Sequence, residues 1–277
     1  MATIGNVLVS IDLSKNSINA LKYAINFAAF FNSKLYVLYK QLDAHKKEVE
    51  LTIQKDYFYR EVEMESEREI DIITKYYLND SKVNYHLIYE NGDSLENLEC
   101  ILGGYDINFF IMGFSDKHSY ERKLLSKNFP DLLVKLNLPL LLIPEDYCFT
   151  GLENLIFAFD FNFLNDLLIL NDILFLACNL KMKTHVLQVS SGRYLCENYF
   201  EENRYKNGLK FNTENFVYKF IRETNNEKAI WRYTGQESGD MLILNPKGRN
   251  GVIDRMVKKI VNNETQFNCN LPILLIY

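Results

Sequence analysis

The sequence predicts an α/β protein with two tandem, doubly wound domains, each built on a five-stranded parallel sheet. Two observations predict this architecture: apolar strand-like runs alternate with helix-period segments, and the whole pattern occurs twice within the 277 residues. The strand-like runs are almost continuously apolar, which indicates strands buried on both faces by helices, as in parallel sheets. We place the domains at residues 1–146 and 152–277, joined through the segment Glu145–Gly151.

The first strand and helix of the two copies carry the same order of residue types. The strands, Ile4–Ile11 and Leu155–Phe159, lead into Asp12 and Asp160 respectively. After each Asp, a polar residue precedes apolar residues spaced i, i+3, i+4 and i+7, which is typical of an amphipathic helix. In the second copy this helix, expected at about 163–180, is apolar on two faces, so we expect the same chain to cover the second face.

The other four strands of each copy follow in matching order. In the first copy they are predicted at Lys34–Tyr39, Val83–Tyr89, Asp106–Gly113 and Leu138–Ile143, and in the second at Thr184–Val189, Phe216–Arg222, Asp240–Asn245 and Leu271–Ile276. The last strand of each copy is short and apolar, and as an open edge it would invite aggregation. We therefore expect these two strands to pair with each other about a pseudo-two-fold axis, which makes a monomer plausible.

Composition and charge exclude several classes of protein. With 48% hydrophobic and 24% charged residues, the chain can bury enough apolar surface to fold, so disorder is excluded. A net charge of −5 and the lack of a basic patch argue against nucleic-acid binding. The most apolar stretch, Phe161–Leu180, contains Asp166 and Asp172, so no membrane-spanning helix is expected. The first residues lack the basic region of a signal peptide, and we expect a cytoplasmic protein.

Cysteines and histidines show no pattern typical of a metal or redox site. The five cysteines form no C-x-x-C pair, and we interpret them as small buried residues in a reducing compartment. The four histidines have no metal-ligand spacing, and His86 and His185 lie in predicted strands, where we expect them to be packed or at an edge. The sequence also contains no Walker loop and no nucleophile elbow. We therefore predict neither a metal site nor an enzymatic activity.

With these residues laid out, the sequence resembles the universal stress protein family in its tandem two-domain form. The resemblance is carried by Asp12 after the V-L-V-S-I strand, the Ser/Asn opener with its Ala-rich helix, the D-I-N-F-F-I-M-G strand ending at Gly113, and the closing N-L-P-L-L-L-I-P. It covers essentially the whole chain. It implies the Rossmann-like fold of adenine nucleotide alpha hydrolases, and a chain that resembles one family dimer closed through its last strands.

The resemblance also implies a candidate nucleotide site, because some family members carry G-x-x-G-x9-G-S/T after the fourth strand. Glycines there let backbone N–H groups approach phosphates, and the Asp that ends the first strand contacts the adenine or ribose. In the first copy Gly113 fits the first glycine, whereas Asp116, Ser126 and Lys127 replace the other motif residues. An Asp at a phosphate cradle repels the ligand, so the motif around Asp12 and Gly113 is broken.

In the second copy the corresponding loop keeps part of the pattern. Asn245 takes the first glycine position and Gly248 the second, while Lys247 and Arg249 add positive charge that suits an anion. A surface turn between strand and helix explains the same residues equally well. Asp160 would contact the base or ribose if a nucleotide bound here, and it serves equally well as a helix-cap or turn residue.

Two function classes therefore remain open. The first is a non-catalytic scaffold or regulatory module of the stress response, which needs no cofactor and acts through an unidentified protein partner. The alternative is an adenine-nucleotide-binding protein that holds ATP or AMP in the second copy. We expect no nucleic acid and no membrane among the partners, and domain–domain pairing within one chain.

Overall fold

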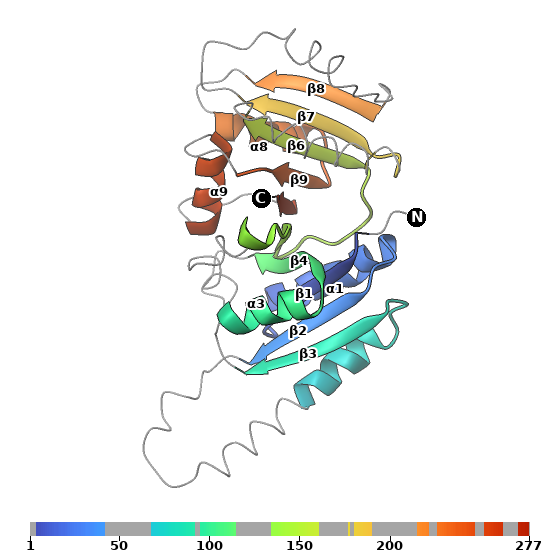
Figure 1. Cartoon of the computed structure of the whole chain (residues 1–277). Coiled ribbons are helices and arrows are strands. Elements are labelled where there is room, and N and C mark those ends of the chain that lie inside the picture. The colour runs from blue at the N-terminus through green and yellow to red at the C-terminus, as the bar shows by residue number, and fades with distance from the viewer. Residues whose placement is uncertain are drawn as a thin grey trace.

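The computed structural model shows a mixed α/β molecule with one large, mainly parallel sheet (Figure 1). It describes residues 4–41, 68–91, 95–114, 134–160, 177, 180–189, 215–221, 226–246, 252–262 and 271–276. The first half contains β1 (Asn6–Ile11), α1 (Lys15–Phe30), β2 (Leu35–Gln41), η1 (Thr74–Leu78), β3 (Tyr85–Asn91), α3 (Leu95–Gly104), β4 (Ile107–Phe114) and β5 (Leu140–Pro144). The second half contains β6 (Asn154–Asp160), β7 (Lys183–Val189), β8 (Phe216–Ile221), α8 (Asn226–Gln236), β9 (Met241–Leu244), α9 (Val252–Asn262) and β10 (Ile273–Leu275).

The ten strands are hydrogen-bonded in the order β3-β2-β1-β4-β5-β10-β9-β6-β7-β8. Strands β6 to β10 correspond to β1 to β5 in sequence. With this correspondence, the strand order read from the β8 end is the same as the order read from the β3 end, as a pseudo-two-fold relation requires. All neighbours are parallel except β5 and β10, which pair antiparallel with Leu142 opposite Ile273. The predicted pairing of the last strands is thus confirmed. The same hydrogen bonds join the two five-stranded parallel halves into one sheet.

Strand register confirms that the two halves repeat one another residue by residue. Val7 on β1 lies beside Phe109 on β4, and Leu155 on β6 lies beside Met241 on β9. Asp12 and Asp160 come five residues after Val7 and Leu155, respectively. Gly113 and Asn245 come four residues after Phe109 and Met241. The equivalences inferred from the sequence therefore hold in the sheet.

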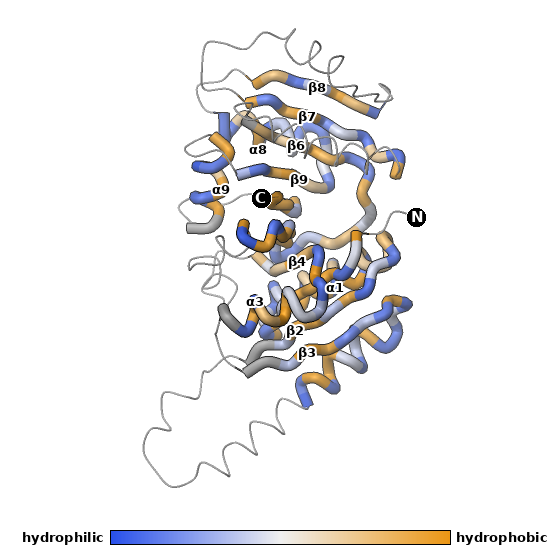
Figure 2. Tube along the Cα trace, viewed as in Figure 1, coloured by the Kyte–Doolittle hydropathy of each residue, from blue (hydrophilic) through white to orange (hydrophobic). Residues whose placement is uncertain are grey.

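Helices cover both faces of the sheet, as a doubly wound fold requires. The core on one face contains α1 and the η1 helix, and the core on the other contains α3, α8 and α9. Each core runs without interruption across the β5–β10 pair: Leu141 and Leu274 belong to the first, Leu142 and Ile273 to the second. Hydrophobic residues follow the inner strands in both halves (Figure 2).

The predicted linker is packed against the first half. The rings of Tyr147 and Phe149 pack against α1, and their centroids lie 6.2 and 5.1 Å from the centroid of the Tyr23 ring. The Tyr147 hydroxyl reaches the second half, where it donates to the backbone oxygen of Asp240 at 3.2 Å. Burial, together with the nearby Asp240 carboxylate, raises the pKa of Tyr147 to about 12, so the phenol stays protonated and keeps its donor. The linker therefore contacts both halves.

Some side chains differ from the sequence-based expectations. Cys100 and Cys148 are exposed free thiols rather than buried residues, because one lies on the outer side of α3 and the other in the linker. The other three cysteines and nearly all of the predicted helix at 163–180 lie outside the described residues. Within the described ranges, no helix has the length and apolar content needed to cross a membrane.

The linker contact leads to a stability prediction. We expect Tyr147→Phe to lower the free energy of unfolding by about 1 kcal/mol, because it removes a half-buried hydrogen bond between the halves. Tyr76→Phe is the matched control, since the Tyr76 ring is 69% exposed. Urea denaturation followed by far-ultraviolet circular dichroism measures both variants. Equal losses in the two variants would contradict a holding role for the linker hydroxyl.

Candidate functional site

The candidate site of the first half lies at the carboxyl edge of the parallel strands, where β1 passes into α1. The Asp12 carboxylate accepts a hydrogen bond from the backbone N–H of Ser14 at 2.9 Å, which closes a turn immediately before the helix. Ser14 is the N-cap of α1, and its hydroxyl accepts from the backbone N–H of Ser17 at 3.2 Å. Leu13, which lies between Asp12 and Ser14, has a left-handed backbone conformation with φ of 63°. Asp12 thus builds the turn that starts α1.

Gly113 lies beside this turn, at the end of β4. A Cβ atom at Gly113 would stand 2.8 Å from the backbone oxygen of Asn16 and 2.9 Å from its carbonyl carbon. The glycine therefore allows the first turn of α1 to approach β4 closely. This contact accounts for a glycine at position 113 without any ligand, because the space that a side chain would fill is occupied by the helix backbone.

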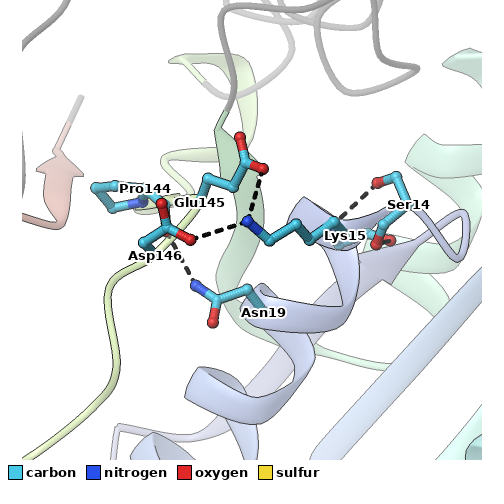
Figure 3. A network of polar contacts seen from close by, with 7 residues as sticks. Ser14, Lys15, Asn19, Pro144, Glu145 and Asp146 are labelled. Atoms are coloured by element: carbon cyan, nitrogen blue, oxygen red, sulfur yellow. Dashed lines mark hydrogen bonds and ion pairs between the residues drawn. The ribbon is translucent and has the colours of Figure 1, made fainter.

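Lys15, the first residue of α1, is held by the linker (Figure 3). Its ammonium lies 3.1 Å from Oε1 of Glu145 and 3.0 Å from Oδ1 of Asp146. Hydrogen bonds and charge from Asp146, and then from Glu145, raise the pKa of Lys15. One turn further along, the Asn19 amide donates to the backbone oxygens of Pro144 and Tyr147 at 2.9 and 3.0 Å. The start of α1 is thereby tied to the end of β5.

The equivalent positions of the second half lie on adjacent strands. Asp160 ends β6 and Asn245 follows β9, and these two strands pair in parallel with Ala158 beside Leu244. The Asn245 side chain is buried, so the second half accommodates a side chain where the first half requires none. Lys247, Gly248 and Arg249, like Asp116, Ser126 and Lys127 of the first half, lie outside the described residues.

Each candidate site lies at the carboxyl ends of the strands of its own half, and Figure 1 shows β2, β3, β6, β7 and β8 pointing to the same side of the view. All strands within a half are parallel, and the two halves are joined by the antiparallel pair of β5 and β10. Asp12 and Gly113 are brought together at the ends of β1 and β4, and Asp160 and Asn245 are brought together at the ends of β6 and β9.

Searches of protein families found no matching family model, and no curated protein matches the chain. Solved structures do match over its whole length. A universal stress protein from Archaeoglobus fulgidus DSM 4304 is 16% identical, with a TM-score of 0.68, covering 99% of this chain and 96% of the other. A putative universal stress protein from Pseudomonas aeruginosa UCBPP-PA14 is 13% identical, with a TM-score of 0.55 and coverage of 99% and 93%. The chain has the universal stress protein fold.

The same fold also occurs in a transporter component. The cytoplasmic domain of a prokaryotic cation chloride cotransporter matches at 11% identity, with a TM-score of 0.51, and covers 99% of this chain and 95% of that domain. At such identities the likeness establishes the universal stress protein fold alone. The resemblance inferred from the sequence is therefore confirmed as a fold.

Two features of the site escaped sequence reasoning. Lys15 and Asn19 were not singled out, because their partners at the end of β5 lie about 130 residues away, at separations of 131 and 125. The signal available was local: both residues lie one turn apart on the helix predicted after the Ser/Asn opener. Within the described part of the chain, no group of three or more His, Cys, Asp or Glu side chains could hold a metal ion.

The role of Gly113 can be tested by stability. We expect Gly113→Ala to lower the free energy of unfolding by about 1–3 kcal/mol, since the added methyl group would overlap the Asn16 backbone. Gly103→Ala is the control, because nothing lies within 4 Å of a Cβ at that position on α3. Thermal and urea denaturation compare the two. If Gly113→Ala unfolds like the control, the close approach of α1 to β4 is wrong.

Proposed function

We propose that this chain is a non-catalytic regulatory or scaffold protein built on the universal stress protein fold. It acts through contact with a protein partner and requires no cofactor for that role. The pairing of β5 with β10 supports a chain that is complete as a monomer, because it joins the last strands of the two halves to each other. The lack of a recognisable catalytic motif in the sequence supports a role without catalysis.

One observation carries this proposal: the described groups at the carboxyl edge of the first half are engaged by the chain itself. An oxygen of Asp12 accepts the hydrogen bond that closes the turn before α1, and the Asn16 backbone lies against Gly113. Lys15 is paired with Glu145 and Asp146. A nucleotide site needs backbone N–H groups open to phosphate and a cation to balance the charge. The edge instead resembles a packed helix start, which favours a degenerate nucleotide site in the first half.

Nucleotide content tests the proposal directly. We expect the purified full chain to release no ATP or AMP when it is denatured and examined by mass spectrometry. We also expect calorimetric titration with each nucleotide to give no binding heat. Stoichiometric nucleotide in the purified chain, or saturable heat, would contradict a ligand-free scaffold.

A second candidate function is ATP or AMP binding in the second half. It is favoured by the position of Asp160 and Asn245 at the ends of neighbouring strands, followed directly by the basic, glycine-containing segment 246–251. The carboxyl ends of neighbouring strands are where nucleotides bind in doubly wound sheets.

Two variants assign any binding to one half. Gly248→Asp places a carboxylate in the second-half loop, where it would repel phosphate, and Asp12→Ala alters the first half only. If the second half binds, heat is lost in Gly248→Asp and kept in Asp12→Ala. Heat that is kept in Gly248→Asp and lost in Asp12→Ala would show that the first half binds and that its site is not degenerate. Circular dichroism checks that both variants are folded.

A further inference from the structure

Helix α8 is attached to the sheet through a buried histidine. His185, on β7, is 1% exposed, and its Nδ1 lies 2.8 Å from the hydroxyl oxygen of Tyr233 on α8. The two rings meet edge to face, with centroids 5.7 Å apart. This pair is a polar contact between the strand and the helix, and both side chains are buried.

The second nitrogen of His185 has no hydrogen-bond partner among the described residues. Nε2 is buried, and nothing in that part of the chain donates to it or accepts from it. A neutral imidazole has one nitrogen that donates and one that accepts, whereas a protonated imidazole has two donors. Protonation would therefore require a second acceptor, and leaving a buried charged donor without one is costly.

The surrounding charges favour the neutral ring. Burial is the main cause that lowers the pKa of His185, and the positive charges of Lys183 on β7 and Lys219 on β8 add to it. The Lys219 ammonium also lies 4.8 Å from the centre of the Tyr233 ring. The Glu237 carboxylate, in the turn directly after α8, lies 3.9 Å from Nδ1 and opposes them. On the other side, β6 presents the apolar Ile156.

We propose that the His185–Tyr233 contact is a pH-sensitive switch that fastens α8 to β7 when the histidine is neutral and loosens the helix when it is protonated. Movement of α8 lets water reach Nε2 and lets Glu237 approach the charged ring. The device belongs to the second half alone. In the first half the equivalent position of the sheet, beside Leu8 rather than Ile156, is occupied by Tyr36 instead of a histidine.

The sign of the effect follows from the ionisation of His185 in the two states. When α8 is loosened, His185 keeps its ordinary affinity for a proton. In the closed state, with α8 fastened to β7, His185 binds that proton more weakly. The closed state is therefore fully favoured above about pH 6.5 and loses its advantage as the pH falls below that value. Acidification is thus the signal that this contact detects.

The chain contains a built-in reporter for this movement. Its single tryptophan, Trp231, lies on α8 and packs partly buried against the core. Loosening the helix exposes the indole to water and changes its fluorescence. We expect the fluorescence of the full chain to change with a one-proton transition and a midpoint below pH 6.5. We also expect the α8 amides to exchange about tenfold faster at pH 5 than at pH 7.5, after correction for intrinsic rates.

Three variants make the test specific. His185→Gln keeps an acceptor for Tyr233 without a titrating group, and it removes the transition. His86→Gln is the matched control, because His86 is exposed on the edge strand β3, and it keeps the transition. If circular dichroism shows that His185→Gln does not fold at pH 7.5, His185→Phe replaces it. Phe is chosen because Tyr36 places a buried aromatic ring at the equivalent position of the first half. A transition that persists without His185, or a wild type that shows none between pH 8 and 5, overturns the proposal.

Discussion

The antiparallel pair of β5 and β10 is the interaction on which the rest of this structure depends. It is short, with Leu140, Leu141 and Leu142 opposite Leu275, Leu274 and Ile273, yet it joins two parallel half-sheets into one. Because both faces of this pair are buried, the cores on the two faces continue from one half into the other. Burial of these apolar strands removes two edges that would otherwise be open to other chains.

Each candidate site is formed within one half of the sheet. Asp12 and Gly113 lie at the ends of the paired strands β1 and β4, and Asp160 and Asn245 lie at the ends of the paired strands β6 and β9. In the first half, groups at the carboxyl ends of the strands are already in contact with the chain itself. The Asn16 backbone lies against Gly113, and the linker carboxylates pair with Lys15. The halves therefore share a fold and a register while offering different chemistry at their edges.

The linker runs along α1 from the start of that helix to its end, because Glu145 and Asp146 pair with Lys15 and Phe149 packs on Phe30. Asp240 lies where the linker leads into β6, accepting from the backbone N–H groups of Glu153 and Asn154 at 2.7 Å each. Tyr147 connects to the backbone of the same Asp240. His185 lies near the start of β7, beside Ile156 of β6, which is the strand that follows the linker.

The sequence by itself determined the repeat, the strands, the equivalence of Asp12 with Asp160 and of Gly113 with Asn245, and the pairing of the last strands. These features are local, since a strand buried on both faces must be apolar along its length and therefore stands out in the chain. Only the tertiary structure decided that Gly113 accommodates the Asn16 backbone, that Glu145 and Asp146 hold Lys15, that Cys100 is exposed, and that His185 meets Tyr233, 48 residues further along. Such contacts depend on how helices are placed over the sheet, and side-chain packing between distant segments leaves no periodic trace in the sequence.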